Sequence, residues 1–406
     1  AEALAAKSLD GFLLSAPESV AWLLNLRARD VECTPMALCR AIIDSEGHVS
    51  LLIDSARISD APSHVSIHSP DALSGVLARW SGKTLGIDES CTPALLVDMI
   101  RTHHVTAVAM EDPCLLRKAI KNPVQLAHIR AAHITDGVAV SQLMHWLDTH
   151  PQIHSVSEMD VADKLLEFRA AMPDFIEPSF PTIAGSGPNG AIVHYRATPA
   201  SNRKLARGEL LLLDSGGQYN GGTTDITRTL AIGKVSSPDI KAQYTRVLKG
   251  HIALATATFP KGTRGSQLDV LARPLLWQVG LDYDHGTGHG VGQCLGVHEG
   301  PQRISKRGGD AVLQPGMILS NEPGYYAAGS HGIRIENLVV VVERAGGMLG
   351  FDTLTCAPLD ISLIDSSLLT QTERSWVQAY HRYVNLSLAN RLPSHVRPWL
   401  DKFVII

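Results

Sequence analysis

The stretch from Leu210 to Thr229 constrains the fold more than any other part of this 406-residue chain. An apolar run ends at Asp214, a turn-forming segment with Asn220-Gly221 follows, and Asp225 opens a second β-prone run. The midpoint between the two aspartates falls one residue away from the Asn-Gly pair. The pattern predicts a β-hairpin that places both carboxylates on neighbouring strands, with a β-bulge that turns them to one face. A single aspartate at a strand end is usually only a turn residue, so acids further along the chain decide its meaning.

Three later segments supply further side chains of the metal-ligand type. Residues 285–292, HGTGHGVG, place His285 and His289 on a loop that bulky side chains do not crowd. NEPG places Glu322 just before a turn, and GIRIEN places Glu336 inside an apolar, strand-like run. The glycine-rich segment has neither the spacing of a dinucleotide-binding motif nor the Lys-Ser/Thr of a phosphate-binding loop. We therefore expect its glycines to let the backbone approach a substrate or a metal ion closely.

Length, charge and cysteine spacing exclude several classes of protein. A chain of 406 residues with 45% hydrophobic residues predicts an ordinary globular protein of two domains. The formal net charge of −4, without a block of Lys or Arg, speaks against nucleic acid or an acidic membrane as a partner. No apolar stretch approaches the ~20 residues of a membrane-spanning helix, and the start lacks the apolar part of a secretory signal. The six cysteines show no metal or disulfide spacing, which favours free thiols and a cytoplasmic location.

The order of the expected elements suggests where the domains meet. Short strands and helices alternate to about residue 120, and Asn122-Pro123 is the expected boundary because proline disfavours helix at the preceding residue. Apolar spacing predicts helices over residues 124–148 and 160–172, the second with Ser157 and Glu158 at its start. Further on, the pattern predicts strands over 180–187, 190–198 and 209–216, and then helices over 238–259 and 266–281.

Five acidic and histidine residues carry a resemblance to a known family. Taken in chain order, they resemble the ligand pattern of the metallopeptidases that include methionine aminopeptidase, prolidase and aminopeptidase P: Asp214, Asp225, His289, Glu322 and Glu336. The runs GAIVHYRAT, LLLDSGGQYNGGTTDITRT, LDYDHGTGHGVGQCLGVHEGP, NEPGYY and GIRIENLVVVV are similar to the long, cytosolic-type Xaa-Pro aminopeptidases of that family.

The resemblance implies an α+β fold, in which a pita-bread catalytic domain of helices outside a curved antiparallel sheet follows a creatinase-like α/β domain. The expected domains are residues 1–122, residues 123–350 and a carboxy-terminal extension over residues 351–406. Long-form members carry a further domain ahead of these, which has no counterpart in the 406 residues and leaves substrate access and assembly open.

A site with four converging carboxylates needs positive charge, and two divalent cations are the simplest source. By the resemblance, Asp225 and Glu336 bridge the two ions, Asp214 completes one coordination sphere, and His289 with Glu322 completes the other. A ligand set of carboxylate oxygens and one imidazole favours Mn²⁺, with Zn²⁺ or Co²⁺ as alternatives. Two ions roughly 3.5–4 Å apart can lower the pKa of a water and polarise a scissile carbonyl. The chain offers no G-x-S-x-G or catalytic-cysteine context that competes with this interpretation.

Histidines beside the ligand motifs are the expected helpers in catalysis. The resemblance assigns proton transfer to Glu322 and places His285, His298 and His194 around the substrate. A lone histidine is more often structural, and the expectation for His194 depends most on its motif, VHYRAT.

Two further residues are expected to contact the substrate. Arg334 has the strand parity of Glu336, so it could bind an acid or the substrate. Tyr326, after the NEPGY turn, is the candidate wall for a proline ring.

The leading hypothesis is a metal-dependent aminopeptidase that hydrolyses the bond between an N-terminal residue and a penultimate proline, using water activated between two metal ions. Its partners would be peptides with proline in the second position. A prolidase, which cuts Xaa-Pro dipeptides, would use the same five ligands. A non-catalytic peptide- or histone-binding module on this fold is the hypothesis from another class, and the complete ligand set disfavours it.

Assembly is the last expectation from the sequence. Trp277 corresponds to an interface aromatic in the cytosolic-type family, which predicts a homodimer. The alternative is a tryptophan buried in the core of its own chain.

Overall fold

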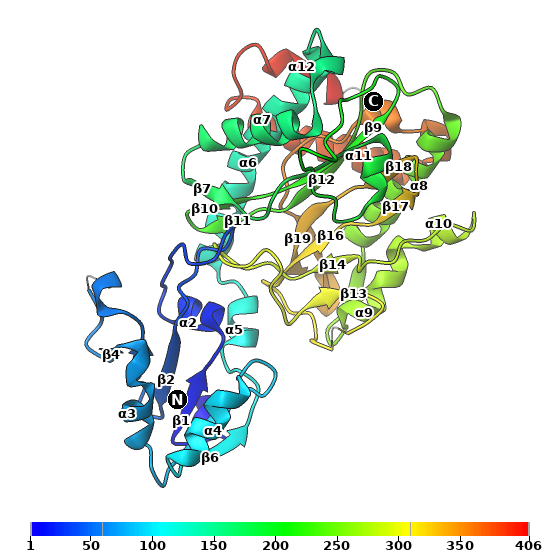
Figure 1. Cartoon of the computed structure of the whole chain (residues 1–406). Helices are drawn as coiled ribbons and strands as arrows, with labels where there is room; N and C mark the ends of the chain where they lie inside the picture. Colours follow the sequence, from blue (N-terminus) through cyan, green and yellow to red (C-terminus); the bar gives the residue numbers. More distant parts are fainter. Residues whose placement is uncertain (1, 59, 309, 405–406) are drawn as a thin grey trace. The chain divides into compact units, whose positions relative to one another are not determined.

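The computed structural model describes residues 2–58, 60–308 and 310–404, and the chain divides into two compact units, residues 1–118 and 119–406 (Figure 1). Among the described residues, no helix is both long and apolar enough to cross a lipid bilayer. All six cysteines are free thiols, as their spacing predicts.

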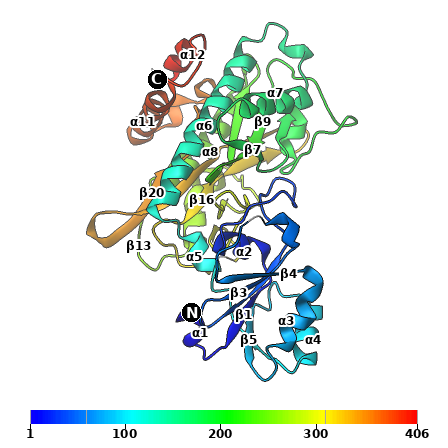
Figure 2. The same cartoon turned by 90° about the vertical axis from the view of Figure 1, so that its left-hand side faces the viewer.

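The first unit is built on a six-stranded mixed sheet with the order β4-β3-β2-β1-β5-β6. Side chains of β1 alternate between two apolar clusters, because successive residues of a strand point to opposite faces. Phe12 and Leu14 pack with Leu4 and Val20, whereas Leu13 packs with residues of α3 and α4, which lie side by side (Figure 2). The elements are α1 (Glu2–Ala5), β1 (Gly11–Leu14), α2 (Pro17–Leu23), β2 (Arg40–Asp44), β3 (Val49–Leu52), β4 (Val65–His68), α3 (Leu73–Ala78), β5 (Thr84–Ile87), α4 (Ala94–Thr102), β6 (Thr106–Ala109) and α5 (Leu115–Ala119).

Two capped helices open the second unit, and both confirm the sequence prediction. α6 (Pro123–Thr149) begins at Asn122, whose side chain accepts a hydrogen bond from the backbone N–H of Gln125, while the side-chain oxygen of Gln125 accepts one from the backbone N–H of Asn122. α7 (Glu158–Ala170) begins with the same arrangement at Ser157. The two helices pack against each other, as Figures 1 and 2 both show.

Every strand pairing among the described residues of the second unit is antiparallel, and helices cover the outside of these sheets, so the unit has the predicted α+β class. A large apolar cluster joins α6, α7, α8 and α11 to β9 and β12. The remaining elements are β7 (Phe175–Pro178), β8 (Ile183–Ser186), β9 (Leu210–Ser215), β10 (Gly217–Tyr219), β11 (Gly222–Thr223), β12 (Ile226–Ala231), α8 (Pro238–Ala255), β13 (Thr258–Pro260), α9 (Gly265–Leu268), α10 (Pro274–Trp277), β14 (Gly288–His289), β15 (Arg303–Ile304), β16 (Ile318–Asn321), β17 (Gly324–Ala327), β18 (His331–Arg334), β19 (Asn337–Glu343), β20 (Met348–Thr353), α11 (Gln371–Leu388) and α12 (Arg397–Asp401).

The predicted hairpin is present, but it needs no bulge between the two aspartates. Tyr219 pairs with Gly222 across a two-residue turn, and Asp214 pairs with Thr227 in the same register further along. Residues directly opposite each other in an antiparallel pair point to the same face, and so do residues two apart on one strand. The strand pairing has the same register on both sides of Asp225. Because Asp225 is two residues from Thr227, it therefore lies on the same face as Asp214. The one-residue offset makes the two carboxylates diagonal neighbours, and the expectation of a bulge was wrong.

Two other predicted elements differ from the structure. Residues 190–198 form no strand. A short 3₁₀ helix covers Gly187–Ala191, and the Tyr195 N–H donates to the carbonyl oxygen of Ile192, so local turns replace the ladder while the Tyr195 hydroxyl donates to Glu158. The helix predicted over 266–281 is broken into α9, a 3₁₀ turn and α10, because Pro274 cannot donate the backbone hydrogen bond that a continuous helix requires.

Candidate metal centre

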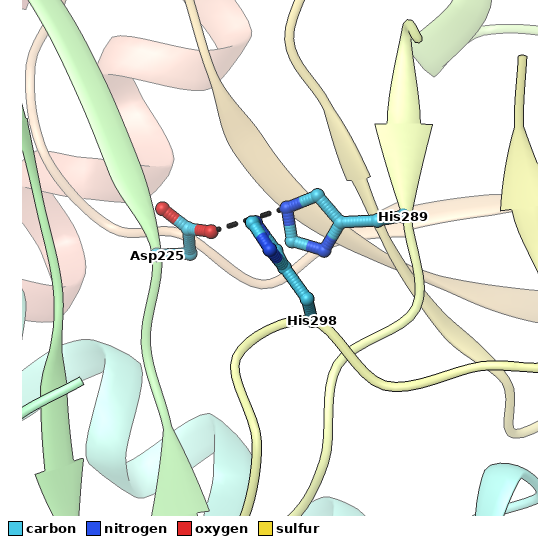
Figure 3. Close-up of side chains that lie close together, drawn as sticks. All are labelled: Asp225, His289 and His298. Carbon is cyan, nitrogen blue, oxygen red and sulfur yellow. Dashed lines mark ion pairs between the residues drawn. The ribbon is translucent and has the colours of Figure 1, made fainter. Parts of the chain in front are cut away.

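The glycine-rich loop carries His289 to the two aspartates of the hairpin. β14 runs so close to β16 that a Cβ at Gly288 would lie 2.0 Å from the carbonyl oxygen of Ser320. Nδ1 of His289 donates to the carbonyl oxygen of Gly290 at 3.0 Å. Nε2 therefore faces the site, 3.3 Å from Oδ2 of Asp225 (Figure 3) and 3.5 Å from Oε1 of Glu322.

Neighbouring strands hold the two glutamates in place. The Glu322 N–H donates to the carbonyl oxygen of Thr287 at 2.8 Å, and Ser320 Oγ donates to Glu322 Oε1 at 3.0 Å. The Glu336 N–H donates to the carbonyl oxygen of Thr227 at 3.1 Å, and Thr227 Oγ1 donates back to Glu336 Oε2 at 2.7 Å. Thr227 thus joins β12, which follows Asp225, to the segment that carries Glu336.

The five candidate ligands converge in a way that fits divalent cations. Ligand atoms of Asp214, Asp225 and Glu336 lie within 4.8 Å of one another, and so do those of His289, Glu322 and Glu336. Within the described residues, Oδ1 of Asp214 and Oε1 of Glu336 are buried without a hydrogen-bond partner. A buried carboxylate oxygen without a partner is costly, whereas a cation would satisfy it. The two groups share Glu336, and their oxygen and imidazole donors suit two divalent cations.

Crowded negative charge shifts the protonation of these groups. Burial and the nearby charge of Asp214 raise the pKa of Asp225 to about 6, although its hydrogen bond with His289 opposes the rise. Burial and the charges of Asp225 and Glu322 raise the pKa of Glu336 well above its ordinary value. Burial disfavours the charged form of His289, yet its contact with Asp225 and the charge of Glu322 raise its pKa to about 9. The chain itself supplies too little positive charge for this cluster.

His298 lies beside the ligand cluster, on the open side. Its ring centroid is 4.2 Å from that of His289, with the two rings at 70°, and Figure 3 shows it next to the His289–Asp225 pair. A ring nitrogen lies within 4.8 Å of ligand atoms of Asp225 and His289, while the residue as a whole is exposed. Burial of the ring and the charge of His289 lower its pKa, which favours the neutral imidazole. His194 is also exposed and lines the same cavity.

A chain of hydrogen bonds connects Asp214 to His285 through two residues that were assigned to substrate contact. Arg334 Nη2 donates to Oδ2 of Asp214 at 2.6 Å, and Nη1 donates to the Tyr326 hydroxyl at 2.6 Å. Tyr326 lies 2.8 Å from Nε2 of His285, whose Nδ1 lies 2.8 Å from the carbonyl oxygen of Gly286. Tyr326 therefore donates to a neutral His285 that carries its proton on Nδ1. Tyr326 is not among the residues that line the cavity, whereas Arg334 and His285, which it contacts, both line it.

The candidate ligands lie in the wall of a cavity of about 650 Å³. His194, His285, His298 and Arg334 also line it. Its apolar wall comes from residues that the sequence did not assign to the site: Phe180, Pro181, Ile183, Val193 and Val297. A cavity with a charged floor and an apolar wall suits a short peptide whose polar backbone must be oriented while an apolar ring is buried.

Sequence reasoning also missed two hydroxyl residues that hold the ligands, Thr227 and Ser320. Both are fully buried, each on a strand two residues from a candidate ligand. A polar residue with ligand parity inside a buried strand is the signal that could have identified them. By contrast, Trp277 lies on α10 with 46% of its surface exposed, near the exposed Val270 and Val279 in sequence, so it is not a core residue of its own chain.

Comparisons with known proteins agree with this geometry. Three family models match the chain, described as the creatinase/prolidase N-terminal domain over residues 1–125, metallopeptidase family M24 over residues 127–343, and the C-terminal region of peptidase_M24 over residues 347–403. Aminopeptidase P2 of Arabidopsis thaliana is 39% identical over 92% of this chain and 58% of its own length. A probable Xaa-Pro aminopeptidase P of Laccaria bicolor is 40% identical over 94% of this chain and 62% of its own length. The chain thus spans about three fifths of these relatives.

Solved structures give the same picture. The crystal structure of an X-prolyl aminopeptidase from Caenorhabditis elegans, described as a cytosolic enzyme with a di-nuclear active site, matches with a TM-score of 0.92 and 32% identity. The match covers 99% of this chain and 69% of that protein. A prolidase from Pyrococcus furiosus matches with a TM-score of 0.71 at 24% identity over 87% of this chain and 98% of its own, which shows a shared fold only.

Proposed function

Because the chain belongs to metallopeptidase family M24, with a creatinase-type first domain and a pita-bread catalytic domain, we propose that it is a metal-dependent aminopeptidase specific for a penultimate proline. It would hydrolyse the bond between the N-terminal residue and that proline. The observation that carries the proposal is the convergence of five hard ligands in the wall of a peptide-sized cavity. The named activity of relatives near 40% identity supports it.

The metal-binding residues in this proposal are Asp214, Asp225, His289, Glu322 and Glu336. The unsatisfied buried oxygens of Asp214 and Glu336 support two divalent cations, and the oxygen-rich donor set favours Mn²⁺ over Zn²⁺ or Co²⁺. When bound, such a pair of cations lowers the pKa of a water and polarises a scissile carbonyl.

Side chains around the ligands would handle protons and orientation. Ser320 donates to Oε1 of Glu322, so Oε2 is the oxygen that we assign to proton transfer. His298 and His194 line the cavity and would donate to the substrate carbonyl or bind its backbone. Arg334 and Tyr326 hold Asp214 and His285 at fixed positions through their hydrogen bonds.

An assay of three peptides tests the activity and its specificity. We expect Mn²⁺-loaded protein to release the first residue from Xaa-Pro-Xaa peptides, and to leave matched Xaa-Ala-Xaa peptides intact. Metal analysis of the same sample should give about two ions per chain. No turnover of any proline peptide by the loaded protein would refute the proposal.

A prolidase is the second candidate, because it would use the same ligands. The third peptide, an Xaa-Pro dipeptide, separates the two: cleavage of the dipeptide alone would indicate a prolidase. The prolidase from Pyrococcus furiosus and an Xaa-Pro dipeptidase from Bacillus anthracis share the fold at 24% and 23% identity, whereas the two relatives near 40% are named aminopeptidases. The complete ligand set argues against a non-catalytic peptide-binding module.

Domain limits, location and assembly are further parts of the proposal. We place the domains at residues 1–122, 123–350 and 351–406, and a cytosolic location is proposed because the C. elegans protein is described as cytosolic. The exposed Trp277 supports a homodimer. Sedimentation should show a dimer that Trp277→Glu weakens, and a monomeric unmodified chain would end that proposal.

A further inference from the structure

Arg228 lies directly beneath the candidate metal centre and faces away from it. It follows Thr227 on β12, so its side chain points to the opposite side of the strand from Asp225 and Thr227. The residue is only 1% exposed, yet no carboxylate lies within ion-pairing distance of it in the part of the chain that the structure describes. A buried guanidinium without an acid partner needs its N–H groups bound to dipoles, so their partners reveal what it holds.

On one side, Arg228 is bound to the carboxy-terminal segment, residues 351–404. Nε donates to the carbonyl oxygen of Pro358 at 2.8 Å, and Nη2 donates to that of Ala357 at 2.8 Å and to the Tyr380 hydroxyl at 2.9 Å. Tyr380 in turn donates to the carbonyl oxygen of Ala357 at 2.7 Å, and its ring stacks on Trp376.

On the other side, Arg228 is bound to the segment of Glu336. Nη1 donates to the carbonyl oxygen of Glu336 at 2.7 Å and to that of Thr227 at 2.9 Å, and Nη2 donates to Oδ1 of Asn337 at 2.9 Å. Thr227 Oγ1 holds Oε2 of Glu336 from the opposite face. Two consecutive residues therefore fix Glu336, one at its carboxylate and one at its backbone.

The helix α8 adds a second tie to the same floor. Nδ1 of His251 donates to the carbonyl oxygen of Asn321 at 3.1 Å, and Nε2 accepts from Nδ2 of Asn337 at 3.2 Å. Asn321 precedes Glu322 and Asn337 follows Glu336, so His251 joins the two ligand segments. The ring of Trp376 packs edge-on against His251, which links this tie to α11 as well.

We propose that Arg228 is a positioning residue that couples the carboxy-terminal segment, through Tyr380, to the carboxylate of Glu336 and thereby sets the affinity of the centre for divalent cations. The inference rests on the proposed function only in taking Glu336 as a metal ligand. Residues that orient metal ligands typically change metal affinity by about 10–100-fold when they are substituted.

The proposal is tested by titrating the metal-free protein with Mn²⁺ and measuring the binding by calorimetry and metal analysis. We expect Arg228→Lys, which keeps the charge but loses most of the fork of donors, to raise the Mn²⁺ Kd by about 100-fold, and Tyr380→Phe, which keeps the ring, by about tenfold. Ser375→Ala is the control: it removes a hydroxyl from an exposed position of the same helix, α11, and its Kd should stay within twofold of the unmodified protein.

Kinetics separate positioning from a general loss of stability. At saturating Mn²⁺ we expect kcat of Tyr380→Phe to recover while KM for the peptide stays unchanged, and urea midpoints show that each variant is folded at the assay temperature. A folded Tyr380→Phe protein with unaltered Mn²⁺ affinity would overturn the inference, even if Arg228→Lys fails to fold. A protein that binds Mn²⁺ tightly but cleaves no proline peptide would refute the proposed function and leave the coupling intact.

Discussion

Two buried aspartates, one packed against a hairpin near its turn and one within the hairpin, are compensated in opposite ways. Asp136, on α6, is 3% exposed and receives hydrogen bonds from Arg169 of α7 and from the hydroxyl of Tyr219, near the hairpin turn. Asp225, in the middle of the hairpin, is 4% exposed and has His289 and other acids as neighbours. Burial would raise the pKa of both. The charge of Arg169 lowers that of Asp136, whereas burial and Asp214 raise that of Asp225 to about 6.

The difference separates buried acids whose charge is neutralised by other side chains from buried acids that need a bound cation. Around Asp136, one guanidinium and one phenol satisfy both oxygens, so the pair anchors the hairpin to α6 and α7. Around Asp225, four carboxylates share the imidazole of His289 and the guanidinium of Arg334, and two carboxylate oxygens remain without a hydrogen-bond partner among the described residues. The two aspartates are equally buried, but only the charge of Asp136 is fully compensated by the chain. Buried carboxylates without such compensation indicate a metal site.

Removal of a shared ligand should have the largest effect. Asp225→Ala or Glu336→Ala should abolish peptide turnover and lower the bound metal, because water cannot replace a carboxylate that contacts both halves of the ligand cluster. The decrease in metal affinity should exceed the decrease of about 10–100-fold that follows substitution of a residue that only orients a ligand. Metal content and turnover near those of the unmodified protein, in either variant, would refute the assignment.

Asp136→Ala should instead destabilise the fold and spare the metal. The substitution leaves Arg169 buried without an acid partner, which should lower the free energy of unfolding by about 3–5 kcal/mol. Urea denaturation measures the loss, and metal analysis below the transition should still show full occupancy.

Glu167→Ala is the matched control on α7, since Glu167 forms an exposed pair with Lys164. Such a surface pair contributes about 0–1 kcal/mol, so the control should unfold close to the unmodified protein. A stability loss in Glu167→Ala equal to that of Asp136→Ala would remove the contrast between buried and exposed pairs.

The sequence predicted the ligand side of this comparison much better than the anchor. Asp214, Asp225, His289, Glu322 and Glu336 were predicted because they lie in short motifs with turn and glycine signals, and the structure brings them together. Asp136 and Arg169 are 33 residues apart in the sequence, on two different helices, and no sequence motif predicts that they pair.

Errors in the predicted elements have physical causes of the same kind. The segment 190–198 has a strand-like pattern, but the backbone N–H groups of Ile192 and Tyr195 close local turns while the Tyr195 hydroxyl binds the distant Glu158. Long-range side-chain partners decide such cases, and periodicity along the chain carries no information about them.

His298→Ala should reduce turnover without loss of metal. His298 lies on the open side of the centre and lines the cavity, and removal of one hydrogen bond to the transition state typically costs ~2.7–4 kcal/mol, or about 10²–10³-fold in kcat. Single-peptide kinetics with parallel metal analysis measure both quantities. Because its ring also lies within reach of Asp225 and His289, metal loss as large as that of His289→Ala would make His298 a ligand instead.

The smallest expected effect concerns the stability of the metal-free protein as the pH changes. The pKa of Asp225 is raised to about 6 and that of Glu336 is raised too, so the folded chain keeps protons that the unfolded chain has lost, and stability falls as pH rises through the folded values. The raised pKa of His289, about 9, acts in the same direction between pH 6.5 and 9. The lowered pKa of Glu322 acts below this window, because its contribution is lost only as pH falls.

Bound Mn²⁺ removes the repulsion and adds about 2.7 kcal/mol at a hundredfold excess over Kd. Thermal melts at pH 5.5 and 8 should therefore show the loaded protein melting higher at both values, with the wider gap at pH 8. A gap that closes at pH 8 would mean that these acids do not share a pair of cations, and that their burial resembles that of Asp136 after all.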